Sequence, residues 1–339
     1  MRELLFPFSW MYQGATGFRN WLYDHSLRRS TQVSAKVISI GNLTVGGTGK
    51  TPVTLALLDL MKKRKYSSGV VSRGYRRSKK GVHEVDGSST SALHFGDEPA
   101  LIKSLHPDVP VVVGEKRVAA AKALLNSRSV DFIFCDDAFQ HRALHRDLNL
   151  VLLDARENQC NYRVMPVGRA RESIKGAVKR VDFFVITKSN LVSAEELETL
   201  QTWIKAKTEK PILLADYVFN GIRSLKGSQQ KSLKDPVYLV SGVARPDSVE
   251  RTIDGVISIV KHKVFPDHHR YTDLEIEAIL DEASQMGARW ILTTAKDAIK
   301  LKHFHRLQER LWVIDLGVEF RGDTAAFYET LDRLAGTRA

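Results

Sequence analysis

Cysteine and long apolar runs are both scarce in this chain. Its 339 residues include only Cys135 and Cys160, so a disulfide framework is not expected and a reducing compartment is favoured. Cys135 lies inside an apolar run, which is typical of a buried side chain rather than a reactive thiol. No apolar stretch reaches the roughly 18–20 residues of a membrane-spanning helix. The N-terminal segment, interrupted by Pro7, lacks the long apolar core of a signal peptide.

Acidic residues are too few to balance the basic ones. The 51 Lys and Arg residues exceed the 39 Asp and Glu residues, which gives a net charge of +12. Such an excess favours an anionic partner, which is a nucleic acid, an acidic membrane surface or a phosphorylated substrate. No nucleic-acid recognition motif accompanies the charge, so nucleic acid is not expected as a partner.

Short apolar runs alternate with helical patterns along most of the chain. The runs are continuously apolar, as in parallel strands that helices cover on both faces. Helix starts are marked by the capping-box pairs Ser193 with Glu196 and Thr272 with Glu275. We therefore predict a doubly wound α/β fold with a mostly parallel sheet. The expected strands are 36–42, 68–74, 110–114, 131–137, 148–154, 181–188, 210–217, 236–242, 257–265, 289–295 and 311–317.

Two α/β units are expected, because 339 residues exceed one comfortable core. The first six strands are assigned to one sheet in a larger domain, residues 31–220. The polar stretch from Gly221 to Asp235 is expected to be a joint that opens a smaller domain, residues 221–339. The last predicted helix, from Ala325 to Leu334, can pack on either domain.

The strongest chemical signal is ISIGNLTVGGTGKTP, residues 38–52. A strand runs into a glycine-rich turn and then into a helix, which is the arrangement of a phosphate-binding P-loop. Lys50 can reach the β- and γ-phosphates and assist catalysis, and the Thr51 hydroxyl can bind Mg²⁺. The general pattern has glycine where this chain has Thr44. The predicted nucleotide-binding residues are Thr44, Val45, Gly46, Gly47, Thr48, Gly49, Lys50 and Thr51.

An acidic pair ends the predicted strand DFIFCDD. Asp136 and Asp137 stand where a Walker B aspartate holds Mg²⁺ directly or through water, so we predict a nucleotide site with Mg²⁺. Without the loop, an ordinary polar turn would be the default interpretation. The double glycine of the loop also resembles partitioning-type ATPases, which carry lysine where this chain has Val45. A partner-activated ATPase switch of the partitioning or targeting type is therefore the alternative function.

Six segments together resemble the lipid A 4'-kinase, or tetraacyldisaccharide 4'-kinase, family of P-loop kinases. They are VGGTGKTP at 45–52, SRGY at 72–75, GDEP at 96–99, GEKR at 114–117, DDAFQHR at 136–142 and FPDHHRY at 265–271. The resemblance implies a P-loop NTPase-like fold and transfer of the ATP γ-phosphate to the 4'-hydroxyl of a tetraacylated glucosamine disaccharide 1-phosphate. It also implies a peripheral protein at the cytoplasmic face of the bacterial inner membrane. No obligate protein partner is inferred.

The same resemblance implies catalytic roles. Asp97 matches the base, His268 the histidine that pairs with it, and Glu98 an acidic residue near the metal. Arg117 matches a phosphate-contacting arginine. From the residue pattern alone, a helix N-cap is the commoner role for Asp97, and Arg117 is equally well explained as a helix-surface arginine. His268 can be a solvated loop histidine near Asp267, and His269 is an equal candidate partner for Asp97.

Some segments depart from the family pattern or remain open. GRARES at 168–173 replaces the usual GPLRE followed by proline, which weakens the implied substrate roles of Arg171 and Glu172. His141 and His145 have a spacing seen in helical zinc sites, but no third ligand accompanies them, so structural or phosphate contacts are favoured. TKSN at 187–190 and TAKD at 294–297 faintly resemble the guanine-reading element of GTPases, and we expect strand-end turns there.

Aromatic and apolar residues are concentrated between residues 4 and 27, and Arg28 and Arg29 follow. This composition is typical of an amphipathic helix in the membrane interface, which we predict for residues 1–30. The alternative is a helix packed on its own domain. Basic clusters at 62–65 and 76–80 would add attraction to acidic lipid.

Overall fold

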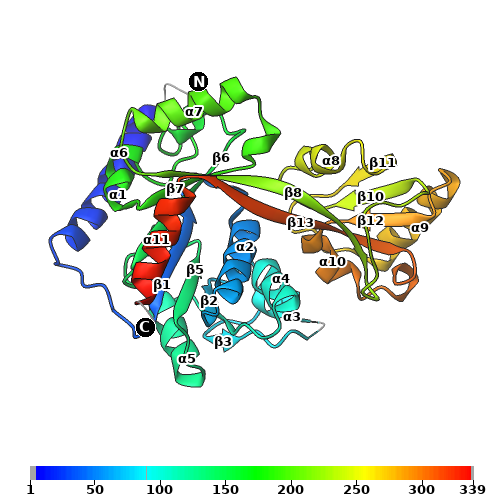
Figure 1. The fold of residues 1–339 in the computed structure, drawn as a ribbon, viewed down its shortest axis with the longest axis horizontal. Coiled ribbons are helices and arrows are strands. Elements are labelled where there is room, and N and C mark those ends of the chain that lie inside the picture. The colour runs from blue at the N-terminus through cyan, green and yellow to red at the C-terminus, as the bar shows by residue number, and fades with distance from the viewer. Residues whose placement is uncertain (1–4, 89, 337–339) are drawn as a thin grey trace.

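One continuous sheet runs through the chain, and helices cover both of its faces (Figure 1). The computed structural model describes residues 5–88 and 90–336. In the described residues the strand order is β11-β10-β12-β13-β8-β7-β6-β1-β5-β2-β4-β3, and β9 pairs with β8. The strands are β1 Lys36–Asn42, β2 Ser68–Ser72, β3 His83–Glu84, β4 Val111–Val113, β5 Phe132–Asp136, β6 Leu148–Asp154, β7 Phe183–Thr187, β8 Ile212–Ser224, β9 Gln229–Gln230, β10 Val237–Ser241, β11 Ile259–Val264, β12 Trp290–Thr293 and β13 Leu311–Gly322.

The predicted α/β class and its mostly parallel sheet are confirmed. All eleven predicted strands form, and the central ones are buried along their whole length, as their continuous apolar character requires. The two-residue strands β3 and β9 were not predicted, because two residues carry no periodic pattern. The α-helices are α1 Phe6–Asp24, α2 Lys50–Lys63, α3 Ser91–Phe95, α4 Asp97–Leu105, α5 Arg117–Ser127, α6 Ile174–Ala177, α7 Ala194–Lys205, α8 Asp247–Ile253, α9 Asp273–Gln285, α10 Ala295–Leu301 and α11 Thr324–Ala335.

Two long antiparallel strands join the halves of the molecule. β8 and β13 pair from Leu213 opposite Gly322 to Ser224 opposite Trp312, and in Figure 1 they run from the larger half into the smaller one. The expected joint at 221–235 therefore contains the end of β8 and all of β9. The division of the chain into domains at residue 220 stays a prediction.

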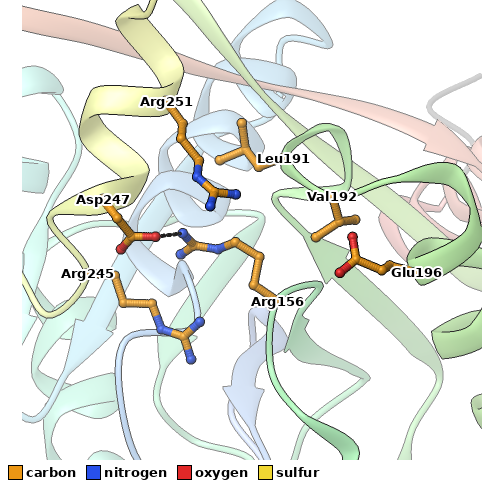
Figure 2. Close-up of a pocket in the computed structure, with 7 residues that line it drawn as sticks. All are labelled: Arg156, Leu191, Val192, Glu196, Arg245, Asp247 and Arg251. Atoms are coloured by element: carbon orange, nitrogen blue, oxygen red, sulfur yellow. Dashed lines mark hydrogen bonds and ion pairs between the residues drawn. The ribbon is translucent and has the colours of Figure 1, made fainter.

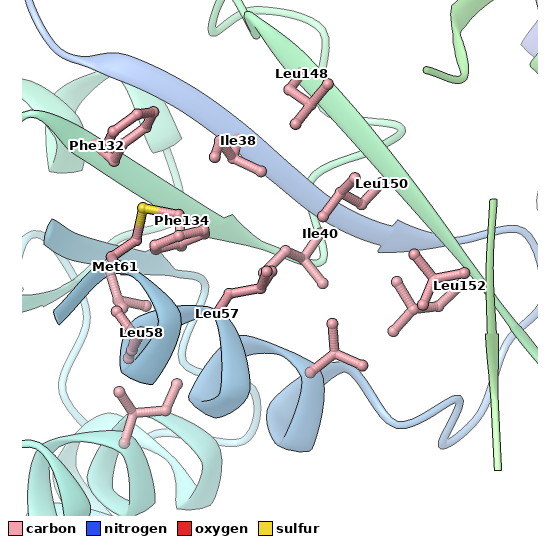
Figure 3. Packing of buried hydrophobic residues seen from close by; sticks show 14 of the residues in the cluster. Ile38, Ile40, Leu57, Leu58, Met61, Phe132, Phe134, Leu148, Leu150 and Leu152 are labelled. Carbon is pink, nitrogen blue, oxygen red and sulfur yellow. The ribbon is translucent and has the colours of Figure 1, made fainter. Parts of the chain in front are cut away.

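The main core lies between the sheet and α2. Leu57 and Met61, one turn apart on α2, are fully buried with Ile38 and Ile40 of β1 and Phe134 of β5 (Figure 3). Each buried side chain of this size contributes about 1.5–3 kcal/mol. This packing holds α2 against the sheet, and with it the loop that joins β1 to α2.

The last helix, α11, packs on the larger half. Phe327 and Leu331 are fully buried in the same core as Ile38. The ring of Phe327 meets that of Phe183 on β7 edge-on, with centroids 5.3 Å apart. After the smaller half, the chain returns to the larger half along β13. The sequence left open on which of the two halves the last helix packs, and the structure shows that it is the larger one.

Both predicted capping boxes are confirmed. Ser193 caps α7 through the backbone N–H of Glu196, and Thr272 caps α9 through that of Glu275, while each glutamate bonds back to the capping residue. These reciprocal bonds satisfy N–H groups that have no partner inside the helix. Helix starts of this kind are readable because the whole signal lies within four residues.

Candidate active site

The glycine-rich loop joins the carboxyl end of β1 to the N-terminus of α2. Gly46 has φ +124°, and Gly49, the N-cap of α2, has φ +83°. L side chains rarely adopt these angles, so glycine is required at both positions. Lys50 and Thr51 are the first two residues of α2, where backbone N–H groups have no partner inside the helix and favour an anion. The loop therefore has the strand–turn–helix context that phosphate binding needs.

Asp137 draws two cations to this loop. Lys50 Nζ lies 3.6 Å from Asp137 Oδ1, and Arg171 Nη1 lies 2.9 Å from the same oxygen. Burial opposes ionisation of Asp137, but Lys50 and Arg171 outweigh it and hold the pKa of this carboxyl below its usual value. Arg171 thus lies at the site, although the segment that contains it, GRARES, departs from the family pattern.

Asp136 has the properties of a metal ligand. It ends β5, the parallel neighbour of β1, and its Oδ2 accepts a hydrogen bond from Ser72 Oγ at 3.2 Å. Its Oδ1 is buried and has no partner among the described residues. Burial raises the pKa of Asp136 to about 6, and the nearby charge of Glu98 adds to this effect. A buried carboxylate oxygen without a partner, beside a phosphate loop, fits Mg²⁺, which prefers oxygen ligands.

Arg117 lies behind Asp136. Its Nη2 donates to the Asp136 carbonyl at 3.3 Å and its Nη1 to the Gly114 carbonyl at 3.2 Å. The side chain is 3% exposed, so the interpretation as a surface arginine is wrong. Arg117 holds the strand end that carries the two aspartates, and its charge lies close to them.

Asp97 and His268 meet from opposite halves of the molecule. Asp97 is the first residue of α4, and Gly96 occupies the N-cap position, so the N-cap interpretation of Asp97 is wrong. His268 Nδ1 lies 2.9 Å from Asp97 Oδ2, with the two side chains 12% and 14% exposed. Burial opposes ionisation of Asp97, but the hydrogen bond from His268 and the charge of Lys300 hold the pKa of this carboxyl below its usual value. Asp97 is therefore a carboxylate that can accept a proton.

His269 faces a different partner. Its Nε2 lies 2.9 Å from Glu275 Oε1, and its ring stacks on Phe265 with centroids 4.6 Å apart. The preceding residue, His268, has φ +65°, and its ring contacts Asp97 instead. The residue pattern left both histidines open, and the geometry places His268 at Asp97.

A pocket of about 490 Å³ opens near the phosphate loop (Figure 2). Ala244, the neighbour of the lining residue Arg245, lies 3.5 Å from where a Cβ on Gly47 would stand. Arg156 Nη1 donates to Asp247 Oδ2 at 2.9 Å across the pocket. Sequence reasoning missed this pocket, because its residues come from three separate segments. They are Arg156, Leu191, Val192, Glu196, Arg245, Asp247 and Arg251.

The strand-end turn expected at 187–190 is confirmed, whereas the segment 294–297 is the N-cap and first turn of α10, directly after β12. In the first, Lys188 pairs with Asp154, Ser189 donates to Asp216, and Asn190 bonds the backbone of Tyr217. In the second, Thr294 caps α10. The side chains of the turn at 187–190 are thus engaged by the protein itself. In the second segment, Lys296 on the first turn of α10 pairs with Glu98 and Asp267, beside Asp97 and His268.

The segment that departs from the family pattern packs on the loop. Thr44 forms an isolated bridge with Ala170, and Val45 N donates to the Arg169 carbonyl at 2.9 Å. A Cβ on Gly46 would lie 2.5 Å from the Arg169 guanidinium. The substituted residues therefore line the phosphate loop, a contact that no local sequence signal indicated.

Helix α1 is anchored by polar groups and leaves aromatic side chains exposed. Ser9 Oγ donates to the Val164 carbonyl at 2.8 Å, and Asn20 Nδ2 donates to Glu172 at 3.0 Å. Trp10 and Phe18 are 69% and 62% exposed. Residues 1–4 of the predicted interface helix lie outside the described residues. Among those described, no helix combines the length and apolar character that crossing a membrane takes.

Comparisons with known proteins extend over both halves of the sheet. The profile of the tetraacyldisaccharide-1-P 4'-kinase family matches residues 1–335. A tetraacyldisaccharide 4'-kinase of Bdellovibrio bacteriovorus is 36% identical over 340 residues, covering 98% of this chain and 99% of its own. That of Syntrophus aciditrophicus is 35% identical over 320 residues, covering 90% and 85%. A crystal structure of LpxK from Aquifex aeolicus in complex with ATP matches with a TM-score of 0.80 at 30% identity and covers 99% of both chains.

Proposed function

The chain belongs to the tetraacyldisaccharide-1-P 4'-kinase family, and we propose that Asp97, His268 and the phosphate loop carry out its reaction. It is a P-loop kinase that uses ATP with Mg²⁺ to phosphorylate the 4'-hydroxyl of tetraacyldisaccharide 1-phosphate in lipid A biosynthesis. The observation that carries the proposed site is the Asp97–His268 hydrogen bond, because the next residue, Glu98, lies close enough to Asp136 to affect its pKa. The alternative of a partner-activated switch is not favoured, because the relatives are named as kinases.

In the proposed mechanism, Asp97 is the general base. Its carboxylate accepts the proton of the 4'-hydroxyl as that oxygen bonds the γ-phosphorus, and the bond from the γ-phosphorus to the bridging oxygen of ADP breaks. His268 holds Asp97 Oδ2 and orients the carboxylate. Both side chains are mostly buried, which limits the access of water that would otherwise compete for the phosphoryl group.

The phosphates are assigned to the loop of residues 44–51. Gly46, Gly47 and Gly49 bring backbone N–H groups close to the phosphate oxygens, and Lys50 stabilises the charge that grows between β- and γ-phosphates. Thr51 and Asp136 would hold Mg²⁺, with Asp137 and Glu98 near it. When bound, this ion neutralises charge on the transferring group. Arg117 would add its charge from behind the strand end.

The pocket of Figure 2 is assigned to the nucleoside. It lies next to the loop residue Gly47, so a nucleoside attached to loop-bound phosphates can reach it. Leu191 and Val192 offer an apolar wall, and the Arg156 and Arg245 guanidinium planes can stack on a base. Arg245→Ala should therefore raise the KM for ATP about tenfold and leave the KM for lipid unchanged.

Association with acidic membrane lipid, at the cytoplasmic face of the inner membrane, is the last part of the proposal. The exposed aromatic side chains of α1 and the net charge of +12 support it. An acyl-chain-bearing substrate also requires the enzyme to work at an interface. Helix α1 can contact the membrane while it stays packed on the larger half. Its contacts to Val164 and Glu172 come from Ser9 and Asn20, and not from the exposed aromatic residues.

The test is ATP turnover in detergent micelles with and without the acylated disaccharide monophosphate. The proposal predicts ADP release that depends on the acceptor and on Mg²⁺. Equal ADP release in micelles without the acceptor would contradict the proposal that Asp97 acts as a base on the 4'-hydroxyl.

A further inference from the structure

A lysine of the smaller half reaches the carboxylate proposed as the base. Lys300 lies on α10 and is 11% exposed, and its Nζ is 3.6 Å from Asp97 Oδ2. His268 Nδ1 contacts the same oxygen. Among the described residues, the two groups that contact this carboxylate, His268 and Lys300, therefore converge on Oδ2. Oδ1 is left as the oxygen that can receive a proton.

The ammonium of Lys300 is itself held in place. It lies 3.1 Å from Asp297 Oδ1 and donates to the His269 carbonyl at 3.0 Å. Asp297 is fully buried, and its Oδ2 accepts hydrogen bonds from Gly242 N at 2.9 Å and Thr294 Oγ1 at 2.8 Å. A buried carboxylate fixed by two hydrogen bonds leaves the lysine little freedom, so the position of Nζ follows from the fold of the smaller half.

Helix α10 also packs directly on the helix that begins with Asp97. Ile299 of α10 is buried against Ala100 and Leu101 of α4. This apolar contact sets the distance between the two helices, and Lys300 follows Ile299 in sequence. The ion pair between Lys300 and Asp97 is thus supported by packing, unlike an exposed pair of long side chains.

We propose that Lys300 is a positioning residue for phosphoryl transfer. With His268 it holds Asp97 Oδ2, so that Oδ1 faces the acceptor hydroxyl, and Asp297 fixes the lysine from behind. This assignment rests on the proposed role of Asp97 as the base. The segment TAKD at 294–297, followed by Lys300, would then serve catalysis and not recognition of the nucleobase.

The test is a double-mutant cycle with Asp97. Lys300→Met, which keeps the side-chain length without the charge, should lower kcat about 10- to 100-fold, because misplacing a catalytic group by about 1 Å costs this much. The KM values for ATP and lipid should stay within about threefold of wild type, since the proposal gives Lys300 a contact with Asp97 and with neither substrate. Lys300→Arg should retain more kcat than Lys300→Met. In the Asp97→Ala background, Lys300→Met should cost less than about twofold, because there is no base left to position.

Two controls keep the result interpretable. Lys302→Met, two residues further along the chain, should leave kcat unchanged. Asp297→Asn keeps an acceptor for Gly242 N, loosens Lys300 and should lower kcat about 3- to 10-fold, and it replaces Lys300→Met in the cycle if that variant does not fold.

Two outcomes would overturn the assignment. The first is unchanged kcat in a folded Lys300→Met protein. The second is a loss of kcat from Lys300→Met that is equal in the wild-type and Asp97→Ala backgrounds. Neither outcome affects the proposed role of Asp97. Near-normal kcat in Asp97→Ala would overturn the assignment and the proposed base together, so the two failures are distinguishable.

Discussion

His268 Nδ1 lies 2.9 Å from Asp97 Oδ2, although 171 residues separate them in the chain. Asp97 stands on α4 of the larger half, and His268 follows β11 of the smaller one. The pair therefore depends on β8 and β13, which join the two halves, and on the packing of α10 against α4. Any test of this pair also tests how the halves are joined.

The first prediction concerns that pair. Asp97→Ala should lower kcat about 10²- to 10⁴-fold, the usual contribution of a general base, while ATP affinity stays within a few-fold. His268→Ala should cost less, and the double variant should be little worse than Asp97→Ala, because residues that act as a unit are not additive. Steady-state kinetics with both substrates provides the measurement. Losses that multiply cleanly would show that the two residues act separately.

The second prediction concerns the phosphate loop. Lys50→Ala should lower kcat at least about 100-fold, because the lost cation stabilises charge that grows in the transition state. Lys63→Ala removes a lysine from the other end of the same helix, where the side chain is exposed, and should leave kcat unchanged. If a folded Lys50→Ala enzyme turned over at the wild-type rate, the loop would not hold the transferring phosphate.

The third prediction concerns the two thiols. Cys135 is fully buried on β5, and burial raises its pKa to about 11, whereas Cys160 is exposed. Because the thiolate is the reactive form, iodoacetamide at pH 8 should modify only Cys160 in the native protein and both thiols in denaturant. Intact-mass spectrometry distinguishes one adduct from two. Rapid modification of native Cys135 would contradict the buried position of β5.

The fourth prediction concerns the membrane. Replacing Trp10 and Phe18 together by alanine should weaken sedimentation with acidic vesicles at least about tenfold, because both side chains are exposed and lose apolar area. The thermal melt should be unchanged, since neither side chain is part of a core. Leu274→Ala removes an even more exposed apolar side chain from the smaller half and is the control. Unaltered vesicle binding by the double variant would leave α1 without an interfacial role.

Features of the fold that depend on residues close in sequence were predicted, whereas those that depend on residues far apart in the chain were not. Strands and capping boxes were predicted because their signals are local: an apolar run, or two side chains three residues apart. The end of β8 beyond residue 217 and the end of β13 beyond residue 317 were missed, because both carry polar residues, such as Arg223 and Arg321, that interrupt the apolar runs. The packing of α11 depends on Phe327 meeting Phe183, a contact that no sequence pattern indicated.

The site divides in the same way. The loop of residues 44–51 was identifiable as one contiguous segment. Asp97 and His268 are chemically ordinary in the sequence, and only the resemblance to a family joined them. Lys300 had no signal at all, because its partner Asp97 is more than 200 positions away in the chain and its support, Asp297, looks like any acidic residue of a helix start.

The most direct test of the account compares wild type and Asp97→Ala by ³¹P NMR of the product. Each enzyme is incubated with Mg-ATP and tetraacyldisaccharide 1-phosphate in detergent, and binding of ATP is measured in parallel. The account predicts a new phosphomonoester at the 4'-position with wild type, and no new resonance with an Asp97→Ala protein that still binds ATP. Phosphate gained at another position, or 4'-product formed at the wild-type rate without Asp97, would contradict it.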